Sequence, residues 1–539
     1  MDIDIVALSR LQFALTALYH FLFVPLTIGL SVIIAIMETV YVMTGRPIWR
    51  DMTKFWGVLF GINFAMGVAT GIVMEFQFGM NWSYYSHYVG DVFGAPLAIE
   101  GLMAFFLEAT FVGLFFFGWD RMSKLSHLIV TWLVAIGSNL SALWILIANG
   151  WMQNPVGAAF NPQTMRMEVT DFFAVLTNPV AQAKFVHTVS AGYTVAAIFV
   201  LGVSAWYVLR GRHLPLAKRS MTVAASFGLA SALSVVVLGD ESGYLSTEHQ
   251  KMKVASIEAM WKTEPAPAAF TAFGFPDQRT RETHFAVHVP WLLGLIGTRT
   301  LTEEIPGIED LVARAETHIK DGLKAYDALQ QIRAAKSDAE VPPAVRAAFE
   351  DNGASLGYAL LLKRYVDDPR QATAEQIDKA AWDLVPPVFS LYWSFRIMVG
   401  LGMFFIALTA TFFVLSARRR LDAHPWLLKL AVIAIPLPWI AAELGWVVAE
   451  VGRQPWVIEG VLPTAVAVSN LGAMTLLLTI IGFVAIYTVL IVIEMRLMLK
   501  AIRKGPAEAP LPPPDGLHRG GAAGAPAPIL PRGSYAAGD

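Results

Sequence analysis

The sequence predicts an all-α polytopic membrane protein with about nine transmembrane helices in helical bundles. Of its 539 residues, 55% are hydrophobic and only 15% are charged, and the mean hydropathy is +0.53. The apolar residues form runs long enough to cross a hydrocarbon core about 30 Å thick as helices. We expect spans at residues 12–42, 55–80, 94–119, 126–149, 185–209, 218–239, 386–416, 427–449 and 467–500.

The first apolar run is expected to remain as a helix rather than to be removed as a signal peptide. Asp2 and Asp4 precede it, and Arg10 is the only nearby cation. The run is also too long for a signal peptide, and no A-x-A cleavage site follows it.

Basic residues predict the orientation of the spans. Lys and Arg follow spans one, three, five, seven and nine, whereas residues 81–93 contain none and residues 450–466 contain only Arg453. Cytoplasmic connections carry the excess of Lys and Arg. The N-terminus is therefore expected outside and the C-terminus in the cytoplasm.

The same alternation divides the chain into four parts. Residues 1–239 hold helices one to six, residues 240–385 form a polar outer-face loop, and residues 386–500 hold helices seven to nine. Within the loop, we expect helices from Ser246 to Trp261 and from Ile308 to Ala335. Residues 501–539 are rich in Pro, Gly and Ala and are expected to be a disordered cytoplasmic tail.

Composition excludes several classes of protein. The chain has no Cys, which excludes disulfides, thiolate-ligated haem, covalent c-type haem and cysteine-ligated iron–sulfur clusters. A formal net charge of −2 gives no reason to expect nucleic-acid binding.

Three side chains inside apolar runs suggest haem ligation. His20 and His187 lie in two such runs and Met398 lies in a third. An imidazole at membrane depth is costly unless it is coordinated or hydrogen-bonded, and a His/Met pair is a recognised set of axial haem ligands. For either histidine, a neighbouring carboxylate or carbonyl remains the alternative partner.

Carboxylates at membrane depth are a second signal, because they often mark proton paths or metal sites. Glu100 and Glu108 are eight residues apart in one span, which corresponds to roughly 12 Å along a helix, and together they suit one proton path. The alternative is that each carboxylate pairs with a basic residue on a neighbouring helix. That alternative is favoured for Glu38, Glu75 and Glu494, which lie near span ends.

Span eight carries an unusual polar stripe. Glu443 and Glu450 are seven residues apart and are expected to share a face, with Trp446 close to that face and Arg453 one turn beyond. This arrangement suits a buried cofactor with a charged or propionate-bearing edge. An interfacial helix end would explain Arg453 but not Glu443.

Several longer strings match one known family. The chain resembles subunit I of cytochrome bd-type quinol oxidases along almost its whole length, to about residue 500. The strings are SRLQFALTALYHFLFVP at 9–25, NWSYYSH at 81–87, APLAIE at 95–100, GWMQNP at 150–155, GDESG at 239–243 and GRQPW at 452–456.

The resemblance implies three haems, namely two haem b and one haem d. It implies that His187 and Met398 are the axial ligands of the low-spin haem b. His20 and Glu450 correspond to ligands of the two high-spin haems, and which of these two residues binds haem d stays open. Glu100 corresponds to a carboxylate beside or on the haem d iron.

The resemblance also assigns residues to quinol and protons. Lys253 and Glu258 match quinol-site residues, and the loop 240–385 matches the long form of the quinol-binding loop. Glu108 matches a residue of the proton route. Arg396 and Arg453 match basic residues near the haems.

The implied protein is a quinol oxidase subunit of the bacterial inner membrane. It would oxidise ubiquinol or menaquinol at the outer face and reduce O₂ to water with cytoplasmic protons, which generates proton-motive force without pumping. A homologous-fold subunit II and at least one small single-span subunit are expected partners. No second buried His pair and no Cys are present, which argues against a haem–copper oxidase.

Two alternatives stay open. A haem-b-only relative without haem d would use the same ligands. A proton-coupled transporter or channel would use the buried Glu residues, but it leaves His20, His187 and Met398 unexplained.

Overall fold

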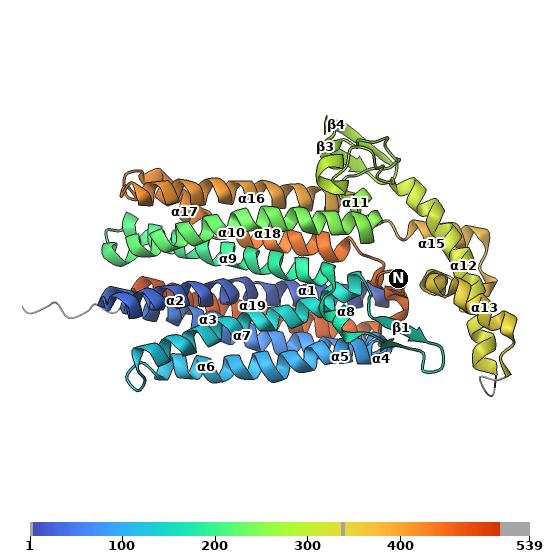
Figure 1. Ribbon diagram of the computed structural model, residues 1–539, viewed down its shortest axis with the longest axis horizontal. Helices are drawn as coiled ribbons and strands as arrows, with labels where there is room; N and C mark the ends of the chain where they lie inside the picture. The colour runs from blue at the N-terminus through green and yellow to red at the C-terminus, as the bar shows by residue number, and fades with distance from the viewer. Residues whose placement is uncertain (1–3, 336–339, 507–539) are drawn as a thin grey trace, which may run out of the picture. The chain divides into compact units, whose positions relative to one another are not determined.

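The computed structural model describes residues 4–335 and 340–506. Within these residues, nine helical segments are long and apolar enough to cross a membrane, which confirms the predicted number of spans. They run side by side in Figure 1, and the segment between the sixth and seventh spans gathers at one end of the bundle. The predicted disorder of residues 507–539 lies outside the described residues.

The membrane-spanning elements follow the predicted order. They are α1 (Ile5–Phe21), α2 (Val24–Thr44), α3 (Pro47–Met80), α5 (Gly90–Ile99), η1 (Glu100–Phe105), α6 (Phe106–Phe117), α7 (Lys124–Gln153), α9 (Pro179–Leu209), α10 (Leu214–His249), α16 (Val388–Ala417), α17 (Pro425–Ile433), α18 (Leu437–Trp446), η7 (Val447–Val451) and α19 (Ala473–Lys504). Elements η1 and η7 are π-helical turns.

The connections contain shorter helices and three antiparallel hairpins, which a purely α-helical prediction did not include. The helices are α4 (Ser83–Tyr88), α8 (Phe172–Leu176), α11 (Lys251–Ile257), α12 (Ile308–Ala334), α13 (Pro343–Asn352), α14 (Leu356–Leu360) and α15 (Ala374–Trp382). The hairpins are β1 (Ala158–Asn161) with β2 (Arg166–Val169), β3 (Phe270–Asp277) with β4 (Glu282–Val289), and β5 (Trp456–Ile458) with β6 (Leu462–Pro463).

Proline explains why two predicted spans are interrupted. The first span breaks between Phe21 and Val24, because Pro25 has no N–H and its ring would clash with the carbonyl of Phe21 in a continuous helix. The eighth span breaks in the same way between α17 and α18, just before Leu437, where Pro436 is the N-cap.

Helix α9 is the centre of the bundle. In its most apolar 18-residue window, 78% of the residues are buried, compared with 11% for α19. A Cβ on Gly29 of α2 would lie 2.5 Å from the carbonyl oxygen of Gly192 on α9. The two backbones are therefore nearly in contact, a close approach that only small residues permit.

Two helices have boundaries that differ from the prediction, and a third is confirmed. The helix expected from Ser246 to Trp261 does not form as one piece, because α10 continues to His249 and Gln250 then leaves helical geometry before α11. Helix α19 extends to Lys504, four residues into the predicted tail. The helix predicted from Ile308 to Ala335 is confirmed as α12.

Candidate functional site

His20 lies on α1, and its imidazole is fixed by α3. Its Nδ1 lies 2.9 Å from Thr70 Oγ1. Thr70 donates its single hydroxyl hydrogen to the carbonyls of Met66 and Gly67, so the neutral His20 ring donates from Nδ1. The lone pair of Nε2 is therefore available, as in a metal-ligating histidine. A Cβ on Gly71 would lie 3.2 Å from His20 Cε1, so glycine leaves space beside the ring.

Helix α18 packs beside this part of α1. Trp439 donates its indole N–H to the Leu22 carbonyl at 2.8 Å, and the rings of Trp446 and Phe21 meet edge-on with centroids 5.2 Å apart. Both carboxylate oxygens of Glu443 are buried, and no described residue hydrogen-bonds them. Because a buried carboxylate without a partner is strongly unfavourable, we expect a bound group or ordered water to complete the surroundings of Glu443.

Helix α10 lies between α9 and α16 and presents glycines to both. A Cβ on Gly228 would lie 2.8 Å from Ala197 of α9 and 3.0 Å from Thr409 of α16. Gly239 is eleven residues further along α10, which is just over three full turns. A Cβ there would lie 3.2 Å from His187 Cε1. The same face of α10 therefore passes beside His187.

The helix register brings Met398 to the level of His187. Met398 is eleven residues from Thr409 on α16, and α16 runs antiparallel to α10, so Met398 comes level with Gly239. Its Sδ lies 3.2 Å from the Cβ position of Gly445 on α18. Nδ1 of His187 is buried, with no hydrogen-bond partner in the described part of the chain. A thioether and an imidazole with a free nitrogen thus occur at one level of the bundle.

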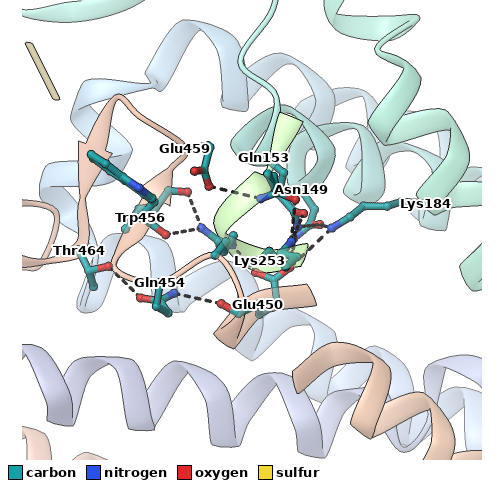
Figure 2. Close-up of polar contacts among 12 residues, drawn as sticks. Asn149, Gln153, Lys184, Lys253, Glu450, Gln454, Trp456, Glu459 and Thr464 are labelled. Carbon is teal, nitrogen blue, oxygen red and sulfur yellow. Dashed lines mark hydrogen bonds and ion pairs between the residues drawn. The ribbon is translucent and has the colours of Figure 1, made fainter. Parts of the chain in front are cut away.

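Glu450 lies in the π-helical turn η7 and is surrounded by donors (Figure 2). Its Oε1 accepts hydrogen bonds from Asn149 and Gln153, each at 3.1 Å, and its Oε2 accepts from Arg453 Nε at 2.7 Å. Lys184 Nζ lies 3.9 Å from Oε1. Glu450 is therefore held as an anion among two cations and two amides.

The predicted stripe along span eight is only partly correct. The Glu450–Arg453 contact confirms the expected neighbours at its end. However, the π turn rotates Glu450 relative to an α-helix, and the described residues give Glu450 several partners but give Glu443 none. The prediction that these two carboxylates share one continuous face is therefore wrong.

Lys253 of α11 joins the neighbourhood of Glu450. Its Nζ donates to Gln153 Oε1 at 3.1 Å and to Gln250 Oε1 at 2.6 Å. A Cβ on Gly452 would lie 3.0 Å from Lys253 Cγ, so glycine lets the lysine stem pass close to this backbone. Burial lowers the pKa of the Lys253 amine, which makes the neutral amine accessible near neutral pH.

Glu258 faces a different partner. Arg396 of α16 donates to Glu258 Oε2 at 3.0 Å and also to the carbonyls of Ile257 and Thr271. The Arg396 and Glu258 side chains are 9% and 5% exposed, so the ion pair is buried. Burial raises the pKa of Glu258 to about 7, although the Arg396 charge opposes the shift. No described hydrogen bond or ion pair links Glu258 with Lys253, and each has its own partners.

Glu100 and Glu108 both bind hydroxyl groups of α7. Ser141 donates to Glu100 Oε1 at 2.7 Å, and Ser138 donates to Glu108. Among the described residues, neither carboxylate has a basic partner within 4 Å, so the alternative of ion pairing is wrong for both. That alternative holds for Glu38, because His127 Nδ1 lies 2.6 Å from its Oε1. It is wrong for Glu75 and Glu494, which have no basic partner within 4 Å among the described residues.

Sequence reasoning missed the polar residues that position the predicted ones. Most are neutral amides or hydroxyls, which are common on helices and give no signal by themselves. These residues are Thr70, Ser138, Ser141, Asn149, Gln153, Lys184, Gln250 and Glu459.

Comparison with known proteins places this arrangement in one family. The family model for cytochrome bd terminal oxidase subunit I matches residues 8–506. The chain is 51% identical to cytochrome bd-II ubiquinol oxidase subunit 1 of Escherichia coli, over 94% of this chain and 97% of that protein. It is 37% identical to cytochrome bd ubiquinol oxidase subunit 1 of Bacillus subtilis, over 92% and 93% of the two chains.

A solved structure shares the fold. The bd oxidase from Geobacillus thermodenitrificans superposes with a TM-score of 0.74 at 24% identity, over 93% of this chain and 99% of that chain. The match spans the helical bundle and the polar segment between its sixth and seventh spans. This chain belongs to the cytochrome bd terminal oxidase subunit I family.

Proposed function

We propose that this chain is the haem-bearing subunit of a terminal quinol:O₂ oxidoreductase. One observation carries the proposal: buried polar atoms on His187 and Glu443 have no partner among the described residues. Such atoms are rare in a folded protein. Three haems, two of type b and one of type d, would supply the missing partners.

The side chains fit haem at two sites, one for the low-spin haem and one for the two high-spin haems. His187 and Met398 would hold the low-spin haem b, because an imidazole and a thioether suit a six-coordinate iron. His20 and Glu450 would hold the high-spin haems, with Glu100 beside haem d. When bound, the haems supply reversible one-electron chemistry and a site for O₂. The neighbouring Trp446 and Arg453 would pack against this centre and neutralise its charge.

Quinol would bind at the outer face around α11. Lys253 and Glu258 would contact its hydroxyl groups, and Arg396 would fix the Glu258 carboxylate through the buried ion pair. A carboxylate with a pKa of about 7 suits a proton acceptor at neutral pH. Ubiquinol and menaquinol both present the same pair of hydroxyl groups.

Protons for O₂ reduction would come from the cytoplasm through Glu108 and Glu100. Their carboxylates follow each other along α7, each held by a serine hydroxyl. Quinol protons would leave at the outer face, so the reaction would separate charge without a pump.

We further propose that this subunit functions with others in a bacterial inner membrane. The spans leave large apolar side chains uncovered, for example Leu102 at 70% exposure and Phe106 at 59%. Lipid and other subunits would cover such faces. A homologous-fold subunit II and at least one small single-span subunit are the expected partners.

The test is spectroscopy and turnover of the purified complex. A reduced-minus-oxidised spectrum with pyridine haemochrome analysis is expected to show haem b and haem d, and quinol is expected to drive O₂ uptake. A third haem b in place of haem d would favour the haem-b-only alternative. Absence of haem, or of quinol-driven uptake, would refute the proposal.

A matched variant tests the quinol site. Glu258→Ala would leave the Arg396 charge buried and unpaired, a loss of about 3–5 kcal/mol, so Glu258→Gln is the cleaner change. It is expected to lower quinol-driven O₂ uptake at least about tenfold while dithionite still reduces every haem. Normal quinol turnover, or loss of haem, would count against the assigned role.

A further inference from the structure

A cavity of about 270 Å³ lies between α11, α12 and residues 452–459. Lys253 is the only quinol residue proposed above that lines it. The remaining titratable and charged groups on its wall come from every element packed around it. They are Glu248, His249 and Lys251 near the α10–α11 junction, Arg314 and His318 on α12, Tyr358 on α14, and Arg453 and Glu459.

Glu459 is one of two glutamates on the wall of this cavity. Its backbone N–H donates to the Met152 carbonyl at 2.9 Å, which anchors it against the end of α7. Its Oε2 accepts a hydrogen bond from Gln250 Nε2 at 3.3 Å. Among the described residues it has no cation within ion-pair distance, unlike Glu258 and Glu450. Hydrogen bonds therefore fix the position of Glu459, but no ion pair with a described residue holds it in its charged form.

Hydrogen bonds join Glu459 to Lys253 and on to Glu450 (Figure 2). Gln250 donates to Glu459 and accepts from Lys253, and Gln153 accepts from Lys253 and donates to Glu450. The chain of contacts is unbroken from the π turn in the bundle to the cavity wall. One glutamine therefore holds the Lys253 amine and the Glu459 carboxylate near each other, and each charge acts on the other.

Burial favours the neutral form of both groups. It raises the pKa of Glu459 and lowers the pKa of Lys253, and each charge partly opposes the shift of the other. Both groups therefore exchange protons nearer to neutral pH than an exposed Glu or Lys.

We propose that Glu459, acting with Lys253, is a further proton acceptor in quinol oxidation, and that it releases the proton into this cavity. This inference rests on the proposed function. Oxidation of one quinol to quinone breaks two O–H bonds and passes two electrons to the low-spin haem. Glu258 would accept one proton. A Glu459 carboxylate oxygen would accept the other across the cavity, and the Lys253 ammonium would hold the quinol oxygen from which that proton leaves.

The test compares Glu459→Gln with Glu248→Gln, which removes an exposed carboxylate from the same cavity wall. Quinol-driven O₂ uptake and its pH profile are measured on the whole complex, together with haem spectra. Glu459→Gln is expected to lower uptake about tenfold, and Glu248→Gln is expected to match the wild type. Glu459→Asp, which keeps an acid, is expected to recover most of the rate.

The pH profile separates proton transfer from a structural role. An acceptor works only when deprotonated, so the rate rises with pH through the pKa of each acceptor. With two acceptors, the acid limb of log rate against pH approaches a slope of two, and in Glu459→Gln it is expected to approach one. An unchanged rate and slope would overturn the inference, as would loss of haem in both Glu459→Gln and Glu459→Asp. If the wild-type complex itself lacks haem or quinol turnover, the proposed function has failed rather than this inference alone.

Discussion

Each candidate ligand side chain is held by its neighbours in a way that limits what it can bind. Thr70 fixes the His20 ring so that Nε2 is available, whereas His187 keeps a buried nitrogen without a described partner. Glu450 is stabilised as an anion by Arg453 and Lys184. The residue types alone indicated candidate ligands. The neighbours determine the protonation state in which each side chain would bind a haem iron.

Met398→Leu is expected to remove the low-spin haem signal while the protein still folds. Leu has nearly the volume of Met, so the packing cost is below about 1.5 kcal/mol, but it provides no sulfur for iron. The measurement is the reduced-minus-oxidised spectrum of the purified complex. Met403→Leu on the same helix is the control, because Met403 is 53% exposed. An unchanged low-spin band in Met398→Leu would rule out this ligand.

Glu108→Gln is expected to slow O₂ reduction at least about tenfold without removing haem. Glutamine keeps the shape and can still accept the hydrogen bond from Ser138, but it cannot carry a proton. Quinol-driven O₂ uptake measures the rate, and Glu494→Gln, a buried carboxylate on α19, is the control. Full turnover in Glu108→Gln would show that protons reach the site by another route.

At the scale of elements, hydropathy was sufficient to predict nine spans but not their interruptions. Apolar runs show where a helix crosses, because burial in lipid requires about 20 apolar residues. The two π turns that contain Glu100 and Glu450 could not be predicted, since nothing in the local sequence distinguishes a π turn from an α turn. Such turns are frequent at functional sites. Here each one begins at or includes a candidate carboxylate.

The same limit applies to contacts between elements. The candidates His20, His187, Met398 and Glu450 could be chosen from the sequence because polar or soft side chains are unusual in apolar runs. Their partners on other helices could not, because serine, threonine and glutamine occur on many helix faces. The separation of Lys253 from Glu258 depends on the break at Gln250, which the amphipathic pattern of residues 246–261 concealed.

Gly239→Ala tests the packing of α10 against the low-spin site. Alanine is favoured over glycine in a helix by about 1 kcal/mol, so the helix itself would be stabilised. Its Cβ, however, would lie 3.2 Å from His187 Cε1 and would push the ring. We expect a weakened or shifted low-spin haem spectrum. Gly243→Ala on the same helix is the control, since a Cβ there meets nothing within 4 Å, and an effect of equal size in both variants would contradict the explanation.

At the scale of the molecule, the basic connections and the proposed quinol site lie at opposite ends of the bundle. The connections rich in Lys and Arg lie at the end of the bundle opposite α12, as Figure 1 shows for the loop between α16 and α17. Helix α12 and the β3–β4 hairpin lie at the other end with the cavity and the proposed quinol site. The orientation of the whole bundle therefore decides the side of the membrane on which quinol protons are released.

The absence of Cys makes that orientation directly measurable. Ala313→Cys on α12 and Ala423→Cys after α16 introduce single thiols at exposed positions at opposite ends. Because Lys and Arg concentrate on cytoplasmic connections, a membrane-impermeant maleimide is expected to label Ala313→Cys in intact cells. Ala423→Cys is expected to react only after the membrane is permeabilised. The reverse pattern would place the quinol site in the cytoplasm, where quinol oxidation would release its protons inside the cell.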